Sequence, residues 1–279
     1  MIISFLTDYG HEDEFVGVCH AVMRGIAPDV PIVDLTHGIT RYGVRQGAIV
    51  LRNASPYVPT GVHVAIVDPQ VGTERRGVAL RTGDGRALVG PDNGLLSLAW
   101  ETCGGVVEAV DISRSPHRLE PVSATFHGRD IFAPVAARLA AGAELAEAGQ
   151  HLDPDELQVL ALPHAEVREG EVVAHVLLVD RFGNASLDIG HADLAGSGLT
   201  LGKPVEIEVR AKGGGSGGGP PDAGERFIAT FAQTFADVRP GDVILYEDAY
   251  RMLAVAVNRG DAGSALRLSP DARVVLRPR

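Results

Sequence analysis

The stretch VHVAIVDP, residues 62–69, indicates most directly how this chain folds. Its apolar run, Val62 to Val67, is typical of a buried strand, and it stops at the polar pair Asp68-Pro69. Residues 2–10, IISFLTDYG, repeat this pattern, because an apolar run ends at a polar turn that contains Asp8. Apolar residues then recur at helical spacing over residues 15–22. Strands that end in polar turns and lead into helices predict an α/β arrangement.

The same alternation continues on both sides of these stretches. It predicts further strands and helices, the strands over residues 32–35, 87–89 and 106–110 and the helices around residues 48–51, 95–101 and 131–141. We therefore expect an N-terminal α/β domain over residues 1–155, with a largely parallel sheet. Ligands of such sheets bind beyond the carboxyl ends of the strands, which is where Asp8 and Asp68 fall.

The character of the sequence changes after about residue 155. Residues 151–171 contain prolines and many charges without a sustained period, which indicates a linker. From residue 172 onward, short β-like segments alternate with turn residues, over residues 172–179, 204–209, 243–246, 253–257 and 273–276. This pattern predicts a small β-barrel or sandwich, and we place a C-terminal domain at residues 170–279.

A glycine-rich run at residues 213–219 interrupts the C-terminal domain, within the stretch GGGSGGGPP. It has neither the Gly-Lys-Ser/Thr ending nor the following helix of a phosphate-binding loop. We interpret it as a flexible, low-complexity loop between strands, and the sequence assigns it no role.

The composition excludes several classes of protein. Apolar residues make up 45% of the 279 residues and charged residues 22%, with a net charge of −11 and no dense Lys/Arg block. A nucleic-acid or acidic-membrane partner is therefore not expected. Two cysteines, Cys19 and Cys103, without a CxxC pair indicate neither a zinc site nor a disulfide framework. The short N-terminal apolar run is no signal peptide and no stretch is long enough to span a membrane, so we expect a soluble, cytoplasmic protein.

Polar motifs of one kind stand at or near the predicted strand ends. Five of them combine Asp, Arg, His, Asn and Gly: TDYG (7–10), VDPQVGTERR (67–76), GPDNG (90–94), TFHGRD (125–130) and DRFGN (180–184). Each motif taken singly is also an ordinary turn or helix cap. HExxH and Walker motifs are absent from the sequence, and GxSxG occurs only within the glycine-rich run, at residues 214–218. The acids do not cluster at metal-ligand spacing, so we expect no metal. The residues alone therefore predict an α/β enzyme with an Asp/Arg/His site and go no further.

Taken together, these motifs resemble those of the S-adenosyl-L-methionine (SAM) hydrolases, also called SAM hydroxide adenosyltransferases, which are relatives of the fluorinase and the chlorinase. The resemblance extends from FLTDYG (5–10) to AVNRGDA (256–262), and VDPQVGTERR is its most specific part. It implies an α/β domain followed by a β-barrel, and hydrolysis of SAM to adenosine and L-methionine without a cofactor. It also implies a homotrimer with its sites between neighbouring subunits.

The resemblance assigns roles to individual residues. Asp68, Arg75 and His127 match the catalytic set, with Arg76 as a rival for the arginine. Other positions match substrate-binding residues: Asp8 for the ribose hydroxyls, Tyr42 near the substrate, Asp180 for the methionine ammonium, Asn184 for the adenine edge, and Phe182, Phe235 and the backbone of Asn258 as neighbours of adenine. Residues 249–250 lack the serine and arginine of the fluorinase, so the sequence leaves recognition of the methionine carboxylate unassigned.

Departures from the halogenases favour water as the nucleophile. Those relatives carry tyrosines at the positions of Asp68 and His127 and a halide-binding serine at that of Gly128. They also have an inserted loop, which the short segment 77–91 of this chain lacks. Two alternatives remain open: a SAM-dependent halogenase, and a protein that binds SAM or adenosine without turnover.

The expected chemistry suits these residue types. The thioether leaves a sulfonium without needing a proton, so the difficult partner is water, whose pKa of about 15.7 makes it a weak nucleophile. An aspartate and a histidine can orient the water and accept its proton. An arginine stays protonated and can stabilise the developing hydroxide.

Overall fold

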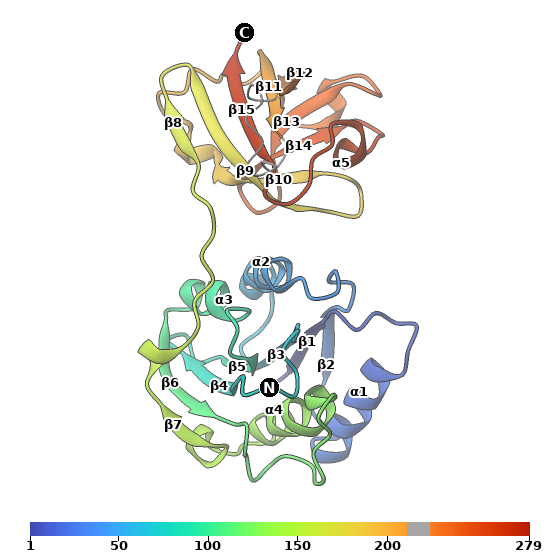
Figure 1. Ribbon diagram of the computed structural model, residues 1–279, viewed down its shortest axis with the longest axis vertical. Helices are drawn as coiled ribbons and strands as arrows, with labels where there is room; N and C mark the ends of the chain where they lie inside the picture. Colours follow the sequence, from blue (N-terminus) through green and yellow to red (C-terminus); the bar gives the residue numbers. More distant parts are fainter. Residues whose placement is uncertain (211–223) are drawn as a thin grey trace, which may run out of the picture. The chain divides into compact units, whose positions relative to one another are not determined.

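The computed structural model of the chain describes residues 1–210 and 224–279, so the glycine-rich run at 213–219 lies outside the described residues. The chain divides into two compact units, Met1–Leu160 and Ala161–Arg279 (Figure 1). Among the described helices, none combines the length and the apolar character that a membrane span requires.

The N-terminal unit is built around a seven-stranded sheet in the order β2-β1-β3-β5-β4-β6-β7. Its strands are β1 (Ile3–Thr7), β2 (Ile32–Thr36), β3 (Val62–Ile66), β4 (Gly77–Thr82), β5 (Ala87–Pro91), β6 (Val106–Asp111) and β7 (Gln150–Leu152). The pairs β2–β1, β1–β3 and β3–β5 are parallel, whereas β5–β4, β4–β6 and β6–β7 are antiparallel. The α/β class is confirmed, but the sheet is not largely parallel as the sequence predicts, because only the half around β1 is parallel.

Two of the three antiparallel pairs involve β4, a strand that the sequence patterns did not predict. Residues 83–86 connect β4 to β5, and so short a connection permits only an antiparallel pair. Gly85 adopts a φ of 88° within this turn, in the region that favours glycine.

Helices cover both faces of the sheet (Figure 1). They are α1 (Phe15–Ile26), α2 (Val44–Ala54), α3 (Ser97–Thr102) and α4 (Ala133–Ala140). On one face α1 and α4 pack against β1, β3 and β5, and the buried thiol of Cys19 belongs to this core. On the other face α2 packs with α3, and Gly47 of α2 approaches Leu6 and Val67 so closely that a larger side chain would displace Leu95.

The C-terminal unit is a closed seven-stranded β-barrel, as the resemblance implies. Its strands follow the order β10-β14-β13-β12-β11-β15-β9, and β9 pairs again with β10 to close the ring. They are β9 (Glu171–Val179), β10 (Ala185–Gly190), β11 (Pro204–Arg210), β12 (Glu225–Phe231), β13 (Val243–Glu247), β14 (Met252–Val257) and β15 (Arg273–Pro278), with β8 (Glu166–Arg168) added beside β9 and the short helix α5 (Ala262–Ala265) after β14. Alternate side chains of the strands fill the barrel with a core of Val, Leu and Ile residues.

Candidate active site

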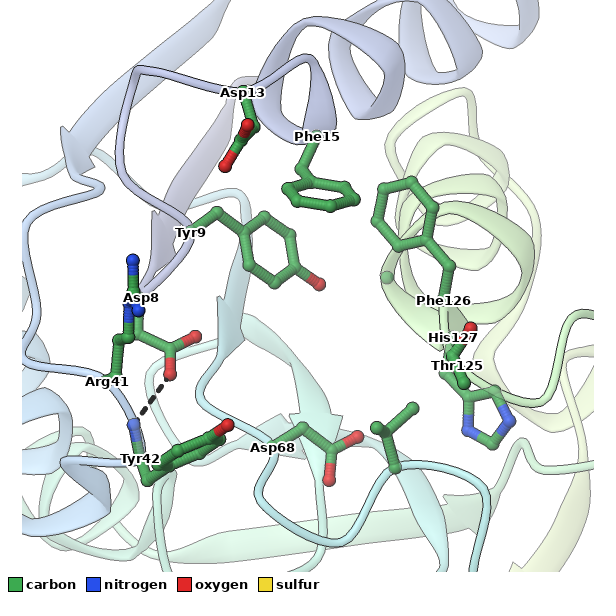
Figure 2. A pocket seen from close by; sticks show the side chains of 12 residues that line it. Asp8, Tyr9, Asp13, Phe15, Arg41, Tyr42, Asp68, Thr125, Phe126 and His127 are labelled. Carbon is green, nitrogen blue, oxygen red and sulfur yellow. Dashed lines mark hydrogen bonds between the residues drawn. The ribbon is translucent and has the colours of Figure 1, made fainter.

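A cavity of about 320 Å³ lies beside the carboxyl ends of β1 and β3 in the N-terminal unit. Asp8 directly follows β1, and Asp68 stands two residues beyond β3. Because these two strands are parallel neighbours, both acids emerge at the same edge of the sheet. The loop after β2 contributes Tyr42, and the segment before α4 contributes His127 (Figure 2). The structure thus brings four of the predicted residues to one cavity of a size usual for ligand pockets.

Arg75 joins two of these residues. Its Nε donates to Asp68 Oδ1 at 3.1 Å, and its Nη2 donates both to Asp68 Oδ2 and, at 3.2 Å, to His127 Nδ1. The side chains of Arg75 and Asp68 are only 3% and 7% exposed. A paired, two-point contact between buried ions holds both groups in a fixed orientation.

Arg76 is directed elsewhere. Its guanidinium forms ion pairs with Asp92 at 2.8 Å and with Glu156 at 3.0 Å, and it also donates to the Glu156 carbonyl. Arg75 and Arg76 directly precede β4, where successive side chains point in opposite directions. Of the two candidate arginines, the structure therefore places Arg75 with Asp68 and His127.

The contact with Arg75 defines the protonation of His127. Arginine can only donate, so His127 Nδ1 must be the acceptor and the proton of the neutral ring lies on Nε2. Burial and the positive charge of Arg75 lower the pKa of His127, and Asp68 opposes part of this effect. The imidazole is therefore neutral near pH 7 and has one lone pair, on Nδ1, that can accept a proton.

Tyr9 also lines the cavity, and the sequence motifs did not mark it as a site residue. A Cβ built on Gly128 would lie 2.1 Å from the Tyr9 hydroxyl oxygen, so this tyrosine occupies the space that a side chain at position 128 would need. Gly128 begins a π-helical turn, Gly128–Phe132, directly after His127. The rings of Phe15 and Phe126 pack against Tyr9 at 5.8 and 5.9 Å (Figure 2). The available signal for Tyr9 was its position beside Asp8 at the end of a strand.

Asp8 shapes the opposite wall. Its Oδ2 accepts the backbone N–H of Tyr42 at 2.9 Å, and Tyr42 has a φ of 65°, which is uncommon for a residue other than glycine. Figure 2 shows the other carboxylate oxygen of Asp8 directed towards the cavity. Burial raises the pKa of Asp8, and the hydrogen bond from Tyr42 opposes part of that rise. The acid thus holds one loop in place and directs its other oxygen to the cavity.

Three of the remaining candidates share the tight turn between β9 and β10. Asp180 Oδ1 accepts the backbone N–H groups of Phe182 and Asn184 at 2.8 and 2.9 Å, and Oδ2 accepts the Asn184 side-chain amide at 2.9 Å. Phe182 is 71% exposed. Asp180 therefore builds this turn, and its predicted contact with an ammonium group stays a prediction.

The last two candidates lie in adjacent loops of the barrel. Asn258 follows β14, and its side-chain amide donates to the carbonyls of Phe235 and Val238, both at 2.9 Å. Phe235 packs against Tyr246 at 5.0 Å and remains 38% exposed. The barrel thus presents two exposed phenylalanine rings, each on a loop that polar side chains hold in shape.

Comparison with known families assigns both units of the chain. Residues 3–149 match the model of the SAM hydroxide adenosyltransferase N-terminal domain, and residues 165–275 match that of the C-terminal domain.

Individual relatives agree with this match. An (R)-S-adenosyl-L-methionine hydrolase of Salinispora tropica is 45% identical, over 98% of this chain and 96% of that protein. A fluorinase of an Actinoplanes species is 31% identical, over 92% of this chain and 91% of that protein. The crystal structure of an uncharacterized conserved protein from Thermotoga maritima superposes with a TM-score of 0.87 at 33% identity, covering 99% of this chain and 100% of that one.

Proposed function

Since the chain belongs to the SAM hydroxide adenosyltransferase family, we propose that it hydrolyses S-adenosyl-L-methionine to adenosine and L-methionine. The observation that supports this function most strongly is the contact of Arg75 with both Asp68 and His127 beside the cavity. It combines a fixed positive charge, a carboxylate and a neutral imidazole, which are the groups needed to turn water into a nucleophile.

The proposed reaction is an in-line displacement at the ribose 5′-carbon. Water forms the new bond from oxygen to C5′, the bond from C5′ to sulfur breaks, and its electron pair leaves on the thioether of methionine. The water proton passes to His127 Nδ1, once the water takes the place of the 3.2 Å contact with Arg75. Arg75 stabilises the developing hydroxide, while Asp68 orients the arginine and the water. The step needs no general acid, because the thioether departs without a proton.

The remaining cavity residues are proposed to bind the nucleoside. The oxygen of Asp8 that faces the cavity suits the ribose 2′- and 3′-hydroxyls, as an acid does in dinucleotide sites. Tyr42 would stand beside the substrate, because Asp8 itself fixes the Tyr42 backbone.

We propose that the barrel supplies the adenine site. The exposed rings of Phe182 and Phe235 offer stacking faces, Asn184 offers an amide for the adenine edge, and the backbone at Asn258 offers further hydrogen bonds. Asp180 is the proposed partner of the methionine ammonium. We further propose a homotrimer in which neighbouring subunits complete each site. Analytical ultracentrifugation should then find three chains per particle, and a monomer would contradict this part of the proposal.

The fluorinase relative provides the specific reason to test a second function. If the chain were a halogenase, chloride or fluoride would convert SAM to a halogenated adenosine. We expect adenosine alone in buffers that contain either halide.

The deciding experiment is chromatography of SAM incubated with the wild type and with a His127→Ala variant. We expect the wild type to release adenosine and methionine in equal amounts, and the variant to be slower by about 10²- to 10⁴-fold, the range usual for loss of a proton acceptor. The acid limb of the wild-type pH profile should lie below pH 6.5, because the pKa of His127 is lowered. If both proteins bind SAM but neither turns it over, the hydrolase proposal is wrong and the chain is a SAM-binding protein. A halogenated product would establish a halogenase.

A further inference from the structure

A second group of chemically active side chains lies in the N-terminal unit and does not line the cavity. His20 of α1, Asp34 of β2 and His37 just after β2 place their ligand atoms within 4.8 Å of one another. Asp34 Oδ1 lies 2.8 Å from His20 Nε2 and 3.0 Å from His37 Nε2. Over residues 1–210 and 224–279, this is the one place where three His, Cys, Asp or Glu side chains converge in this way.

The orientation of His37 sets the group apart from an ordinary ion pair. Its side chain is fully buried, and Thr7 Oγ1 contacts its Nδ1 at 2.8 Å. The other nitrogen, Nε2, is buried without a hydrogen bond of acceptable geometry, even though Asp34 Oδ1 is near. A buried nitrogen that is fixed by its neighbour and lacks a well-aligned partner calls for an explanation.

The other two side chains leave the group open to solvent. His20 is 28% exposed and Asp34 is 38% exposed, so an ion could enter and keep water on its free positions. Calcium and magnesium prefer sites made of oxygen ligands, whereas two imidazoles and a carboxylate suit zinc and similar transition ions. The contact between His37 Nδ1 and Thr7 also matches the outer hydrogen bond that metal-bound histidines commonly make.

We propose that His20, Asp34 and His37 form a binding site for a divalent transition metal ion such as Zn²⁺. His20 lies in α1, whereas Asp34 and His37 lie in β2 and directly after it, so the ion would join α1 to the end of β2. The loop after β2 also contacts the end of β1, because His37 accepts the Gly10 backbone N–H at 2.8 Å through its carbonyl oxygen. The ion would therefore brace the segment that carries Asp8. This inference does not depend on the proposed function, because its site holds none of the residues assigned to hydrolysis.

The test measures metal binding directly. Tag-free full-length protein is stripped with a chelator, dialysed and titrated with Zn²⁺ by calorimetry, and the visible absorption of the Co²⁺ form reports the ligand geometry. We expect one ion per chain, and a loss of affinity of about tenfold or more in the His20→Asn variant. His20 is the variant of choice because it is partly exposed, so its replacement does not disturb the core. Asp34→Asn serves as a second ligand variant.

His175→Asn is the matched control. His175 also lies 2.9 Å from an aspartate, Asp188, and is exposed to the same degree as His20, but the structure gives that pair no second histidine. The control should bind Zn²⁺ as the wild type does. The proposal is overturned if the wild type binds no ion at submillimolar Zn²⁺, if His20→Asn and Asp34→Asn retain wild-type affinity, or if His175→Asn loses the same ion.

Discussion

The two units of this chain hold their candidate residues in opposite ways. In the N-terminal unit, Arg75 and Asp68 are buried ions that fix each other, and Arg75 also contacts His127. In the barrel, Phe182 and Phe235 stand exposed on loops that are braced by hydrogen bonds among polar groups of the loops.

This difference indicates that the two units have different functions. Burying charged groups is costly unless they are paired, and a pair that also contacts a neutral histidine beside a cavity points to chemistry. Exposed aromatic rings on shaped loops suit recognition of a flat, apolar ligand face. We therefore expect changes in the N-terminal unit to alter turnover, and changes in the barrel to alter substrate affinity.

After the loss of His127 itself, the largest expected effect comes from the contact between Arg75 and Asp68. Arg75→Lys keeps the positive charge but loses the two-point contact with Asp68, so kcat should fall by about 10²-fold. Arg76→Lys is the matched control, because it makes the same change one residue further on, where the partners are Asp92 and Glu156. Steady-state release of adenosine measures both. An equal loss of kcat in Arg76→Lys would remove the distinction between the two arginines.

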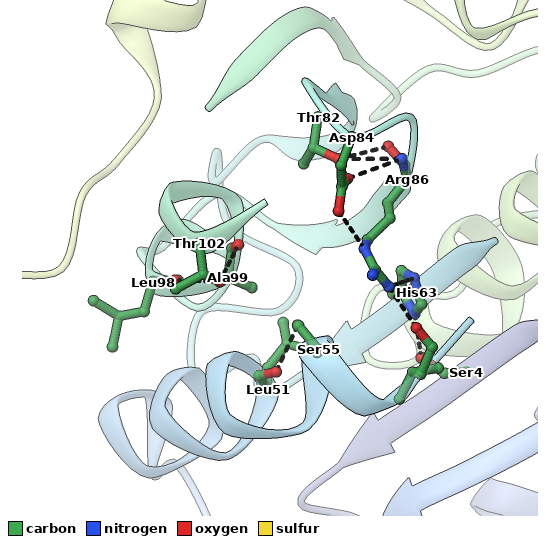
Figure 3. A network of polar contacts seen from close by, with 11 residues as sticks. Ser4, Leu51, Ser55, His63, Thr82, Asp84, Arg86, Leu98, Ala99 and Thr102 are labelled. Atoms are coloured by element: carbon green, nitrogen blue, oxygen red, sulfur yellow. Dashed lines mark hydrogen bonds and ion pairs between the residues drawn. The ribbon is translucent and has the colours of Figure 1, made fainter. Parts of the chain in front are cut away.

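The second effect distinguishes the two units by how their stability depends on pH. His63 is buried in β3 between Ser4 Oγ, at 2.7 Å, and the Arg86 guanidinium (Figure 3). Burial and the charge of Arg86 lower its pKa from 6.5 to about 4. Because the folded pKa lies below the unfolded one, the stability from neutral His63 is complete above pH 6.5 and is lost as pH falls towards 4. At pH 5 the free energy of unfolding of the N-terminal unit should be about 2 kcal/mol lower than at neutral pH.

The barrel should not lose stability in the same way at pH 5. Its buried acid, Glu208, has a pKa lowered below 4.5, chiefly by the hydrogen bond from Arg277, so the stability it contributes persists at pH 5. Urea unfolding followed by the fluorescence of Trp100, the single tryptophan, reports on the N-terminal unit, and hydrogen exchange reports on both units. His63→Gln should reduce the pH dependence of the Trp100 transition. An equal loss of stability in both units at pH 5 would contradict the prediction that His63 causes the loss.

The third effect tests the packing behind His127. In Gly128→Ala the new methyl group would lie 2.1 Å from the Tyr9 hydroxyl oxygen, so Tyr9 or the turn that carries His127 must move. We expect kcat to fall by about tenfold or more, because a catalytic group misplaced by about 1 Å can cost about 10²-fold in rate. Adding Tyr9→Phe removes that oxygen and leaves the nearest ring carbon at 3.2 Å, so the double variant should recover part of the loss. No recovery would show that Tyr9 is not the obstacle.

The sequence predicted the positions of the two acids of the candidate site better than those of their partners. Asp8 and Asp68 are marked by local signals, because each ends an apolar run. The choice between Arg75 and Arg76 depends on how the chain enters β4, a strand whose pairing becomes evident only in the folded sheet. The contact between Tyr9 and Gly128 joins residues far apart in the chain, and no local pattern encodes it. The barrel is closed, as the resemblance implies. That Asp180 accepts hydrogen bonds from the backbone of its own turn is evident only from the folded structure.

The smallest expected effect lies in the barrel and completes the comparison. Phe182→Leu keeps an apolar side chain on the turn but removes the aromatic face, which is worth about 1 kcal/mol beyond the area that it buries. We therefore expect KM for SAM to rise about fivefold while kcat stays unchanged. Tyr57→Leu is the control, since Tyr57 is an equally exposed ring of the N-terminal unit that does not line the cavity. A fall in kcat instead of a rise in KM would mean that the barrel takes part in the chemistry, because only interactions made in the transition state alter kcat.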